Sequence, residues 1–141
     1  MTDAGLKHLS ALKELETLNL SMTQVSDEGT RRLGDFVNLH ELDLDNTDVT
    51  DDGLEQVARL KKLEFLRLAD LPLTDQGLKR LTALAGLKTL ILDGTAVTDA
   101  SLETIGSMKS LTRVSIKQTR VTVAGAASLR SKNASLTIIG P

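Results

Sequence analysis

The amino-acid sequence predicts an α/β solenoid, a stack of repeated units in which a short helix is followed by a short strand. Three observations support this prediction. The same pattern recurs every 24 residues, with units starting at Thr2, Ser26, Thr50, Thr74, Thr98 and Thr122. Within each unit the apolar residues change from three-residue steps to strict alternation. No unit can bury its apolar residues alone, so neighbouring units must stack and share one core.

The first half of each unit has the spacing of a short helix. In the Thr74 unit, Leu78, Leu81 and Leu84 follow one another at three-residue steps, which places them on one side of a helix. The equivalent helix positions are Leu9, Leu33, Val57, Leu81, Ile105 and Leu129, followed by a turn column of Leu12, Phe36, Leu60, Leu84 and Met108. We expect both columns to be buried.

The second half of each unit has the spacing of a strand with one buried face. Leu90 and Leu92 alternate with Thr89, Ile91 and Asp93. The inward pairs in successive units are Leu18/Leu20, Leu42/Leu44, Leu66/Leu68, Leu90/Leu92 and Val114/Ile116. Together with the helix positions, they predict a continuous aliphatic core.

A hydroxyl residue followed by aspartate precedes five of the predicted helices. These pairs are Thr2-Asp3, Ser26-Asp27, Thr50-Asp51, Thr74-Asp75 and Thr98-Asp99. Short oxygen-bearing side chains accept hydrogen bonds from the first turn of a helix, and a carboxylate there favours the helix dipole. A calcium ladder is the alternative, but calcium needs six to eight oxygens and the row offers about one carboxylate per unit. We therefore expect caps and no metal.

A threonine column follows the strands, at Thr23, Thr47, Thr95 and Thr119. A hydroxyl there can bond to the backbone of the turn and of the next unit, as buried backbone requires. Leu71 interrupts the column, with Pro72 beside it. The loop of the third unit should therefore differ from the others.

These residues resemble the leucine-rich repeat family. The frame is Leu15-x-x-Leu18-x-Leu20-x-x-Thr23-x-Val25, and it starts again at Leu39, Leu63, Leu87 and Leu111. Threonine replaces the family's usual asparagine, which is similar to bacterial repeats with the pattern L-x-x-L-x-L-x-x-T-x-V-T-D-x-G-L. The resemblance covers residues 1–141 as a single domain. It implies a right-handed horseshoe with a parallel sheet on the concave face and short helices on the convex face.

Composition disfavours several classes of function. The chain is 40% apolar and 26% charged, has a net charge of −2 and contains no cysteine. This balance does not favour nucleic acid or membrane, no apolar run approaches a membrane span, and the first residues do not form a signal peptide. A basic strip on the helices, from Arg31 to Arg80, fits a solvated surface, because nucleic-acid binding usually adds aromatic residues or a high positive charge. The compartment stays open, with the cytoplasm slightly favoured.

The two ends of the array differ in sequence. Repeat arrays normally need a polar cap, yet the first unit begins in phase at Thr2 without one. Either the chain is part of a longer protein, which we favour, or its open end pairs with another subunit. In the truncated sixth unit Val123 replaces the aspartate, and the alanines at 124, 126 and 127 predict a reduced helix. We expect this unit to be a C-terminal end.

The concave side of the strands carries the candidate binding residues. Phe65 and Ile91 are apolar where a structural strand usually places polar residues, and adjacent strands allow them to touch diagonally. Arginine and acidic residues surround them, as in an interface hot spot. The partner-binding residues we expect are Phe65, Arg67, Ile91, Glu41, Asp43, Asp45, Asp93 and Arg113.

Function is therefore predicted to be recognition of another protein, without a cofactor. The alternatives are a structural or self-associating segment of a longer protein, and a small-ligand or glycan sensor, which the lack of tyrosine and tryptophan disfavours. Catalysis has little support. His8 and His40 occupy different positions of the repeat, and no cysteine or nearby base activates the serines and threonines.

Overall fold

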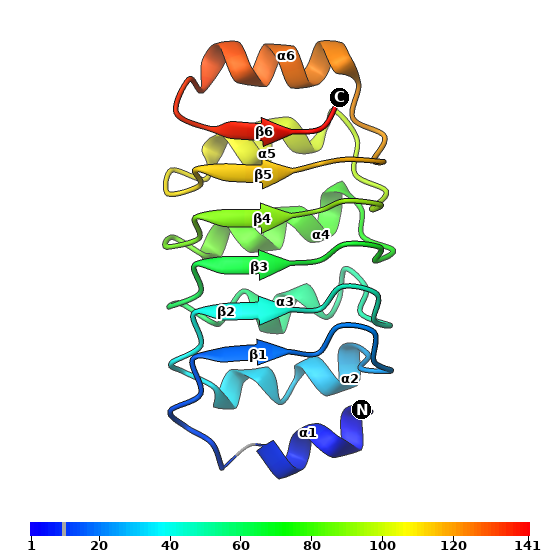
Figure 1. The fold of residues 1–141 in the computed structure, drawn as a ribbon, viewed down its shortest axis with the longest axis vertical. Coiled ribbons are helices and arrows are strands. Elements are labelled where there is room, and N and C mark those ends of the chain that lie inside the picture. Colours follow the sequence, from blue (N-terminus) through cyan, green and yellow to red (C-terminus); the bar gives the residue numbers. More distant parts are fainter. Residues whose placement is uncertain (10) are drawn as a thin grey trace.

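The computed structural model describes residues 1–9 and 11–141, which form six coils of one helix and one strand each (Figure 1). The strands are β1 (Thr17–Asn19), β2 (Glu41–Asp43), β3 (Phe65–Arg67), β4 (Thr89–Ile91), β5 (Arg113–Ser115) and β6 (Thr137–Ile139). The α-helices are α1 (Asp3–Leu9), α2 (Asp27–Thr30), α3 (Leu54–Val57), α4 (Asp75–Arg80), α5 (Ser101–Ser107) and α6 (Val123–Lys132). Short 3-10 helices follow α2 and α4, at η1 (Leu33–Asp35) and η2 (Leu81–Ala83).

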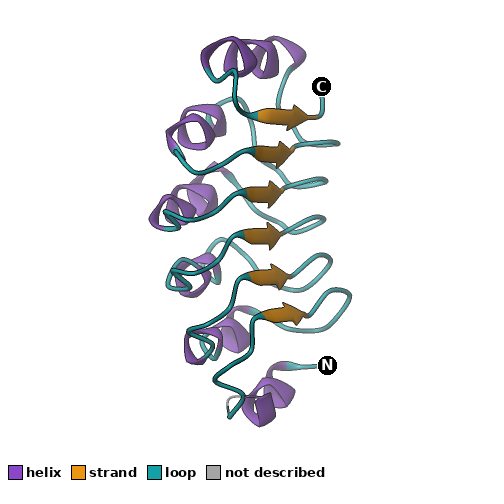
Figure 2. Ribbon diagram, turned by 60° about the vertical axis from the view of Figure 1, so that its left-hand side comes forward, coloured by secondary structure: helices purple, strands orange, loops and turns teal. Residues whose placement is uncertain are grey.

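The strands form one open sheet of six parallel strands in sequence order, β1-β2-β3-β4-β5-β6. The helices lie on one side of this sheet and form the convex side of a right-handed solenoid, while the strands line the concave side (Figure 2). The predicted fold class is therefore confirmed. None of the helices in the described part of the chain is long and apolar enough to cross a membrane.

The core lies between the sheet and the helices. The middle residue of every strand is buried, and its parallel neighbours continue the same column, as in Leu42, Leu66 and Leu90. Phe36, Leu60 and Leu84 of the predicted turn column are also buried. Burial of this continuous aliphatic core stabilises coils that could not fold separately.

Two sequence predictions about the ends of the array were wrong. Leu12 was expected in the core but is 49% exposed, and its neighbours Leu9 and Leu15 are only partly buried. These residues belong to the first coil, which packs against a coil on one side only. The helix of the sixth coil is not reduced: α6 has 10 residues, because alanine is the best helix former and Thr122 caps its first turn.

The Ser/Thr-Asp pairs have two separate roles. From the second coil on, the hydroxyl accepts a hydrogen bond from an N–H two or three residues later, which confirms the predicted caps. The aspartate instead reaches the next coil. Asp51, for example, accepts hydrogen bonds from the backbone N–H of Thr74 (2.9 Å) and from its hydroxyl (2.6 Å).

The same pair of bonds recurs between every two neighbouring coils, and we call it the aspartate ladder. Its rungs are Asp3–Ser26, Asp27–Thr50, Asp51–Thr74, Asp75–Thr98 and Asp99–Thr122. Hydrogen bonds from the Thr122 backbone and hydroxyl lower the pKa of Asp99, which keeps this carboxylate ionised. Hydrogen bonding between coils, rather than calcium, therefore accounts for the row of aspartates.

The ladder also explains the glycine of the T-D-x-G pattern. A Cβ atom on Gly77 would collide with the carboxylate of Asp51, and Gly29, Gly53 and Gly125 face their own rung in the same way. The glycine therefore makes room for the aspartate of the preceding coil. Ser101 replaces it in the fifth coil, where its hydroxyl donates to the carbonyl of Thr98 at 2.8 Å.

The turns after the strands repeat a second set of contacts. Each threonine of the predicted column donates its hydroxyl to the carbonyl three residues earlier, as Thr95 does to Leu92 at 2.6 Å. Leu71, which interrupts the column, is buried instead. Pro72 has no N–H, so the third coil lacks the backbone bond that Asp48 makes to Val25 in the second. The expected local difference in this loop is confirmed.

The ladder should contribute measurably to stability. We expect Asp51→Ala to lower the free energy of unfolding by about 1–3 kcal/mol, because it leaves the Thr74 N–H without its partner. The adjacent Asp52→Ala is the matched control, since Asp52 is 81% exposed and makes only a surface ion pair with Arg80, worth about 0–1 kcal/mol. Urea denaturation of both variants measures the difference, and equal losses would show that the ladder adds nothing.

Two leucines of the same repeat column differ in burial, so their truncation should cost different free energies of unfolding. Leu84→Ala removes a side chain that is 3% exposed, and we expect it to cost about 2–5 kcal/mol in the free energy of unfolding. Leu12→Ala makes the same change at the exposed position of the first coil and should cost less than about 1 kcal/mol. A large loss for Leu12→Ala in urea denaturation would mean that the first coil buries this residue in solution.

Candidate functional site

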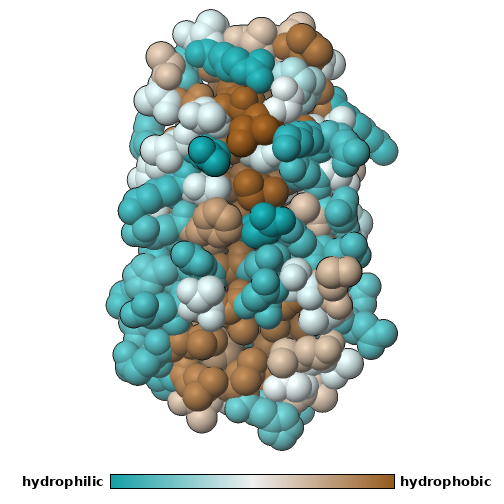
Figure 3. All heavy atoms as spheres, viewed as in Figure 1, coloured by the Kyte–Doolittle hydropathy of each residue, from teal (hydrophilic) through white to brown (hydrophobic). Residues whose placement is uncertain are grey.

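The side chains on the concave face lie in three rows that run across the strands. The first row is Thr17, Glu41, Phe65, Thr89, Arg113 and Thr137, and the second is Asn19, Asp43, Arg67, Ile91, Ser115 and Ile139. Two residues further along each coil lies the third row, Ser21, Asp45, Ala69, Asp93 and Lys117. Apolar side chains form a narrow strip along the middle of this face, and polar side chains flank it on both sides (Figure 3).

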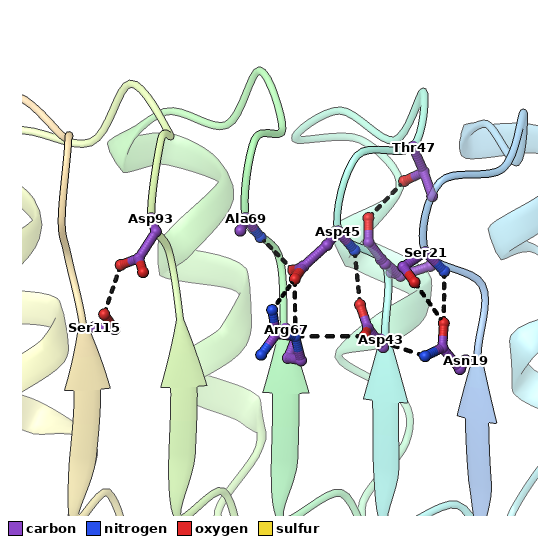
Figure 4. A network of polar contacts seen from close by, with 10 residues as sticks. Asn19, Ser21, Asp43, Asp45, Thr47, Arg67, Ala69, Asp93 and Ser115 are labelled. Atoms are coloured by element: carbon purple, nitrogen blue, oxygen red, sulfur yellow. Dashed lines mark hydrogen bonds and ion pairs between the residues drawn. The ribbon is translucent and has the colours of Figure 1, made fainter.

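Arg67 is held by two aspartates of the neighbouring coil. Its guanidinium forms an ion pair with Asp45, to which Nε donates at 2.8 Å, and Nε lies 3.4 Å from Oδ2 of Asp43 (Figure 4). The hydrogen bond to Asp45 is the main cause of the raised pKa of Arg67. Sequence reasoning placed these three residues together correctly but did not foresee that they bind one another. The arginine is therefore fixed in position and its charge is balanced.

Two of the predicted acidic residues also bind the backbone of the next coil. Asp45 accepts from the Ala69 N–H at 2.7 Å, and Asp93 accepts from the Lys117 N–H at 2.9 Å. Asp93 further accepts from the hydroxyl of Ser115 at 2.6 Å. Both aspartates occupy the same repeat column, which is the signal that could have revealed this role. They fix the ends of the strands as well as giving the face its charge.

Phe65 and Ile91 are half-buried on adjacent strands, where Ile91 pairs with Arg67 and Phe65 pairs with Thr89. A shallow hollow of about 220 Å³ lies against Phe65, and its other walls are His40, Glu41, Glu64, Lys88 and Thr89. The ammonium of Lys88 donates to Glu64 at 2.7 Å and lowers the pKa of that carboxyl. The hollow thus combines an aromatic side chain with charged walls at the start of the strands.

Glu41 and Arg113 are the predicted site residues that point into solvent without a partner. Both are exposed, and neither side chain makes a hydrogen bond or ion pair with the described residues. Sequence reasoning omitted Ile139, which β6 adds to the second row beyond Ser115. The alternation of Thr137, Ile138 and Ile139 is the signal that places it there, because only the middle residue is buried.

A second hollow lies on the helix side, between α5 and α6. Its volume is about 630 Å³, and Leu102, Leu129, Glu103 and Lys132 are among the residues that line it. The small side chains of α6 leave this space, since Gly125 and Ser128 face it. Sequence analysis did not identify this hollow, and none of the predicted binding residues lines it.

Catalytic and metal-binding groups do not gather on the described surface. His8 lies in α1, whereas His40 precedes β2 and lines the hollow beside Phe65. No group of three or more His, Asp or Glu side chains in residues 1–9 and 11–141 is arranged to hold a metal ion. What the concave face offers chemically is an apolar strip with charges on both sides.

Comparisons with known proteins relate this architecture to bacterial repeat proteins. The sequence model of the Leucine Rich repeat family matches residues 13–34 and 37–58. The crystal structure of internalin C2 from Listeria monocytogenes is 25% identical, with a TM-score of 0.73 over 94% of this chain and 54% of that chain. A comparison with curated protein sequences found no match.

Two further structures show similarity of fold alone. The internalin InlF of Listeria monocytogenes is 19% identical, with a TM-score of 0.56 over 93% of this chain and 49% of that chain. A leucine-rich-repeat protein of Leptospira interrogans is 23% identical, with a TM-score of 0.64 over 94% and 33%. This chain therefore spans about half the length of the similar structures or less. Folds of this kind are typically protein-interaction modules and generally non-enzymatic scaffolds.

Proposed function

We propose that this chain, whose fold is that of leucine-rich-repeat proteins, binds another protein on its concave face, centred on Phe65, Arg67 and Ile91. The observation that carries the proposal is the pair of half-exposed apolar side chains, Phe65 and Ile91, in the middle of a face with charged surroundings. The repeat frame does not need an apolar residue at either position. Apolar anchors in the centre with a polar rim are the usual arrangement of a binding hot spot.

The fixed arginine supports the same proposal. Arg67 is 41% exposed, although Asp45 and Asp43 hold its guanidinium in place. Its position beside Ile91 is therefore already set before a partner arrives, which lowers the conformational entropy lost on binding. Arginine is also enriched at the centres of protein interfaces.

The size of the face limits the partner. Six strands at about 4.8 Å spacing make a sheet about 25–30 Å wide, and each strand has only three residues. This strip is smaller than the roughly 800 Å² that each partner contributes to a standard interface. We propose that the turns after the strands extend it. Met22 of the first turn is 83% exposed and gives an apolar surface there.

We further propose that the module acts without catalysis, cofactor or metal. Support comes from the general scaffold role of this fold and from the separation of His8 and His40. The charged groups in the middle of the face are used in contacts between coils, as Arg67 and Asp45 are. Binding alone is the activity that this arrangement of side chains supports.

Self-association is the second candidate, and exposed apolar residues of the first coil favour it. Met1 is 56% exposed and Leu12 is 49% exposed, next to the partly buried Leu9 and Leu15. Light scattering across a wide concentration range distinguishes the two candidates. We expect the monomer mass at every concentration, whereas a mass that rises with concentration and falls again in Leu12→Ser would favour self-association.

Removal of the aromatic anchor should weaken partner binding while the fold stays intact. We expect Phe65→Ala to reduce affinity for a partner isolated with the wild-type chain by more than about fivefold, which corresponds to about 1 kcal/mol. Isothermal titration calorimetry measures the affinity, and circular dichroism checks the fold. The anchor is lost because alanine removes the half-buried ring that Phe65 presents on the concave face.

Val123→Ala is the matched control for this experiment. Val123 is 67% exposed and lies in α6 on the helix side, so its truncation removes an apolar side chain outside the concave face. We expect its affinity to equal that of the wild type. Unchanged binding by Phe65→Ala, or an equal loss in both variants, would rule out the concave face as the binding surface.

A further inference from the structure

The strands and the turns that follow them reverse their charge between the second and the fifth coil. In three repeat columns an acidic residue of the second coil corresponds to a basic residue 72 residues later, three coils along the stack. These pairs of positions are Glu41 and Arg113, Asp45 and Lys117, and Asp48 and Arg120. The repeat frame does not explain the reversal, because a structural column keeps the same kind of residue in every coil.

The sheet places the reversed charges at a fixed separation. In the parallel register Glu41 pairs with Phe65, Phe65 with Thr89 and Thr89 with Arg113. These four residues therefore lie in one row. Three strand spacings separate Glu41 from Arg113, a distance of about 14 Å. Phe65 lies between them, and Ile91 lies between the corresponding strands in the second row. The order across the face is therefore acidic, apolar and basic.

The charges at the two ends are free to act on a partner. Glu41, Arg113 and Lys117 are exposed, and within residues 1–9 and 11–141 their side chains make no hydrogen bond or ion pair. The charges nearer the middle are used internally. Arg67 is balanced by Asp43 and Asp45, so this group of three keeps one net negative charge on the acidic side.

We propose that the concave face binds a peptide segment of a partner protein that carries basic and acidic residues on opposite sides of an apolar residue. This inference rests on the proposed function and specifies the partner's chemistry. The segment lies across the strands, with its basic end over β2 and its acidic end over β5. Complementary charges fix its orientation, and Phe65 and Ile91 contact the apolar residue in the middle.

The separation of the charges sets the spacing in the bound segment. An extended peptide rises about 3.3 Å per residue, so about four residues separate its basic and acidic side chains. A helical segment rises 1.5 Å per residue, so about nine residues separate them. The across-strand direction follows from the shape of the face, because six strands give more length than three residues along each strand.

Selection from a random 14-residue peptide library, displayed on phage, tests the proposal directly. The immobilised chain is the bait at low salt, and peptides that also bind the Phe65→Ala variant are removed. We expect the remaining sequences to share a basic and an acidic residue at one of these two spacings, with an apolar residue between them. Fluorescence anisotropy of the synthesised peptides then gives their affinities.

Charge reversal provides the second part of the test. Arg113→Glu should weaken the selected peptides at least tenfold, and replacement of their acidic residue by lysine should restore binding to this variant. Lys109→Glu is the matched control, since Lys109 is exposed between α5 and β5 and lies outside the three rows. It should leave every affinity within about twofold. Both variants change exposed residues, and circular dichroism checks that each remains folded.

The possible outcomes separate this inference from the proposed function. The inference would be overturned by peptides whose binding depends on Phe65 but whose sequences show no separated charges, or whose affinity is unchanged by Arg113→Glu. Either result would leave the proposed function valid. A selection without any Phe65-dependent peptide would overturn both the inference and the proposed function.

The charge pattern is also complementary to a second copy of the chain in the opposite orientation, with its fifth coil over the second coil of the first copy. A dimer of the chain that Arg113→Glu dissociates would show that a second copy, not a foreign peptide, occupies the face.

Discussion

The hydrogen bonds from each aspartate to the hydroxyl residue of the next coil are the constraint on which the structure depends. A carboxylate such as Asp51 must meet the N–H and hydroxyl of Thr74 and fit over Gly77, so three groups from two residues of one coil are tied to one residue of the coil before it. An insertion or deletion anywhere between two rungs would move all three partners. This requirement explains why the step between units is 24 residues throughout the chain.

Once the step is fixed, the rest of the coil follows from packing and hydrogen bonding. Parallel strands in register bury their middle leucines against the helices, and the third-row aspartates fix the strand ends. Local exceptions remain tolerable where another contact takes over. Ser101 replaces a ladder glycine and bonds to Thr98, while Leu71 replaces a turn threonine and becomes buried. The frame thus leaves the outward strand positions free to vary.

The sequence predicted the fold because periodicity reports burial, and burial decides between helix and strand. The sequence was less informative about contacts where one side chain has two possible hydrogen-bond partners. A Thr-Asp pair indicates a helix cap in any single unit, and the aspartate's bond to the next coil becomes visible only when coils are aligned in space. The exposure of Leu12 has the same origin, since its column is buried only where a coil has a neighbour on both sides. The mutual binding of Arg67, Asp43 and Asp45 was unpredictable because it depends on rotamers across adjacent strands.

The internal contacts determine which charged side chains of the concave face are held in place and which are free. Asp45 and Asp93 are held by backbone groups of the next coil, and Arg67 is held by Asp45, so their positions are set by the solenoid itself. Rigid charges of this kind shape the local potential but have few hydrogen-bonding groups left for a partner. In the proposed function, discrimination between partners then depends on the free side chains of Glu41, Arg113 and Lys117, while Phe65 and Ile91 contribute apolar area. Because coils two and five hold these free charges on a rigid sheet, the repeat step that stabilises the fold also sets the distance between the charges that we propose a partner recognises.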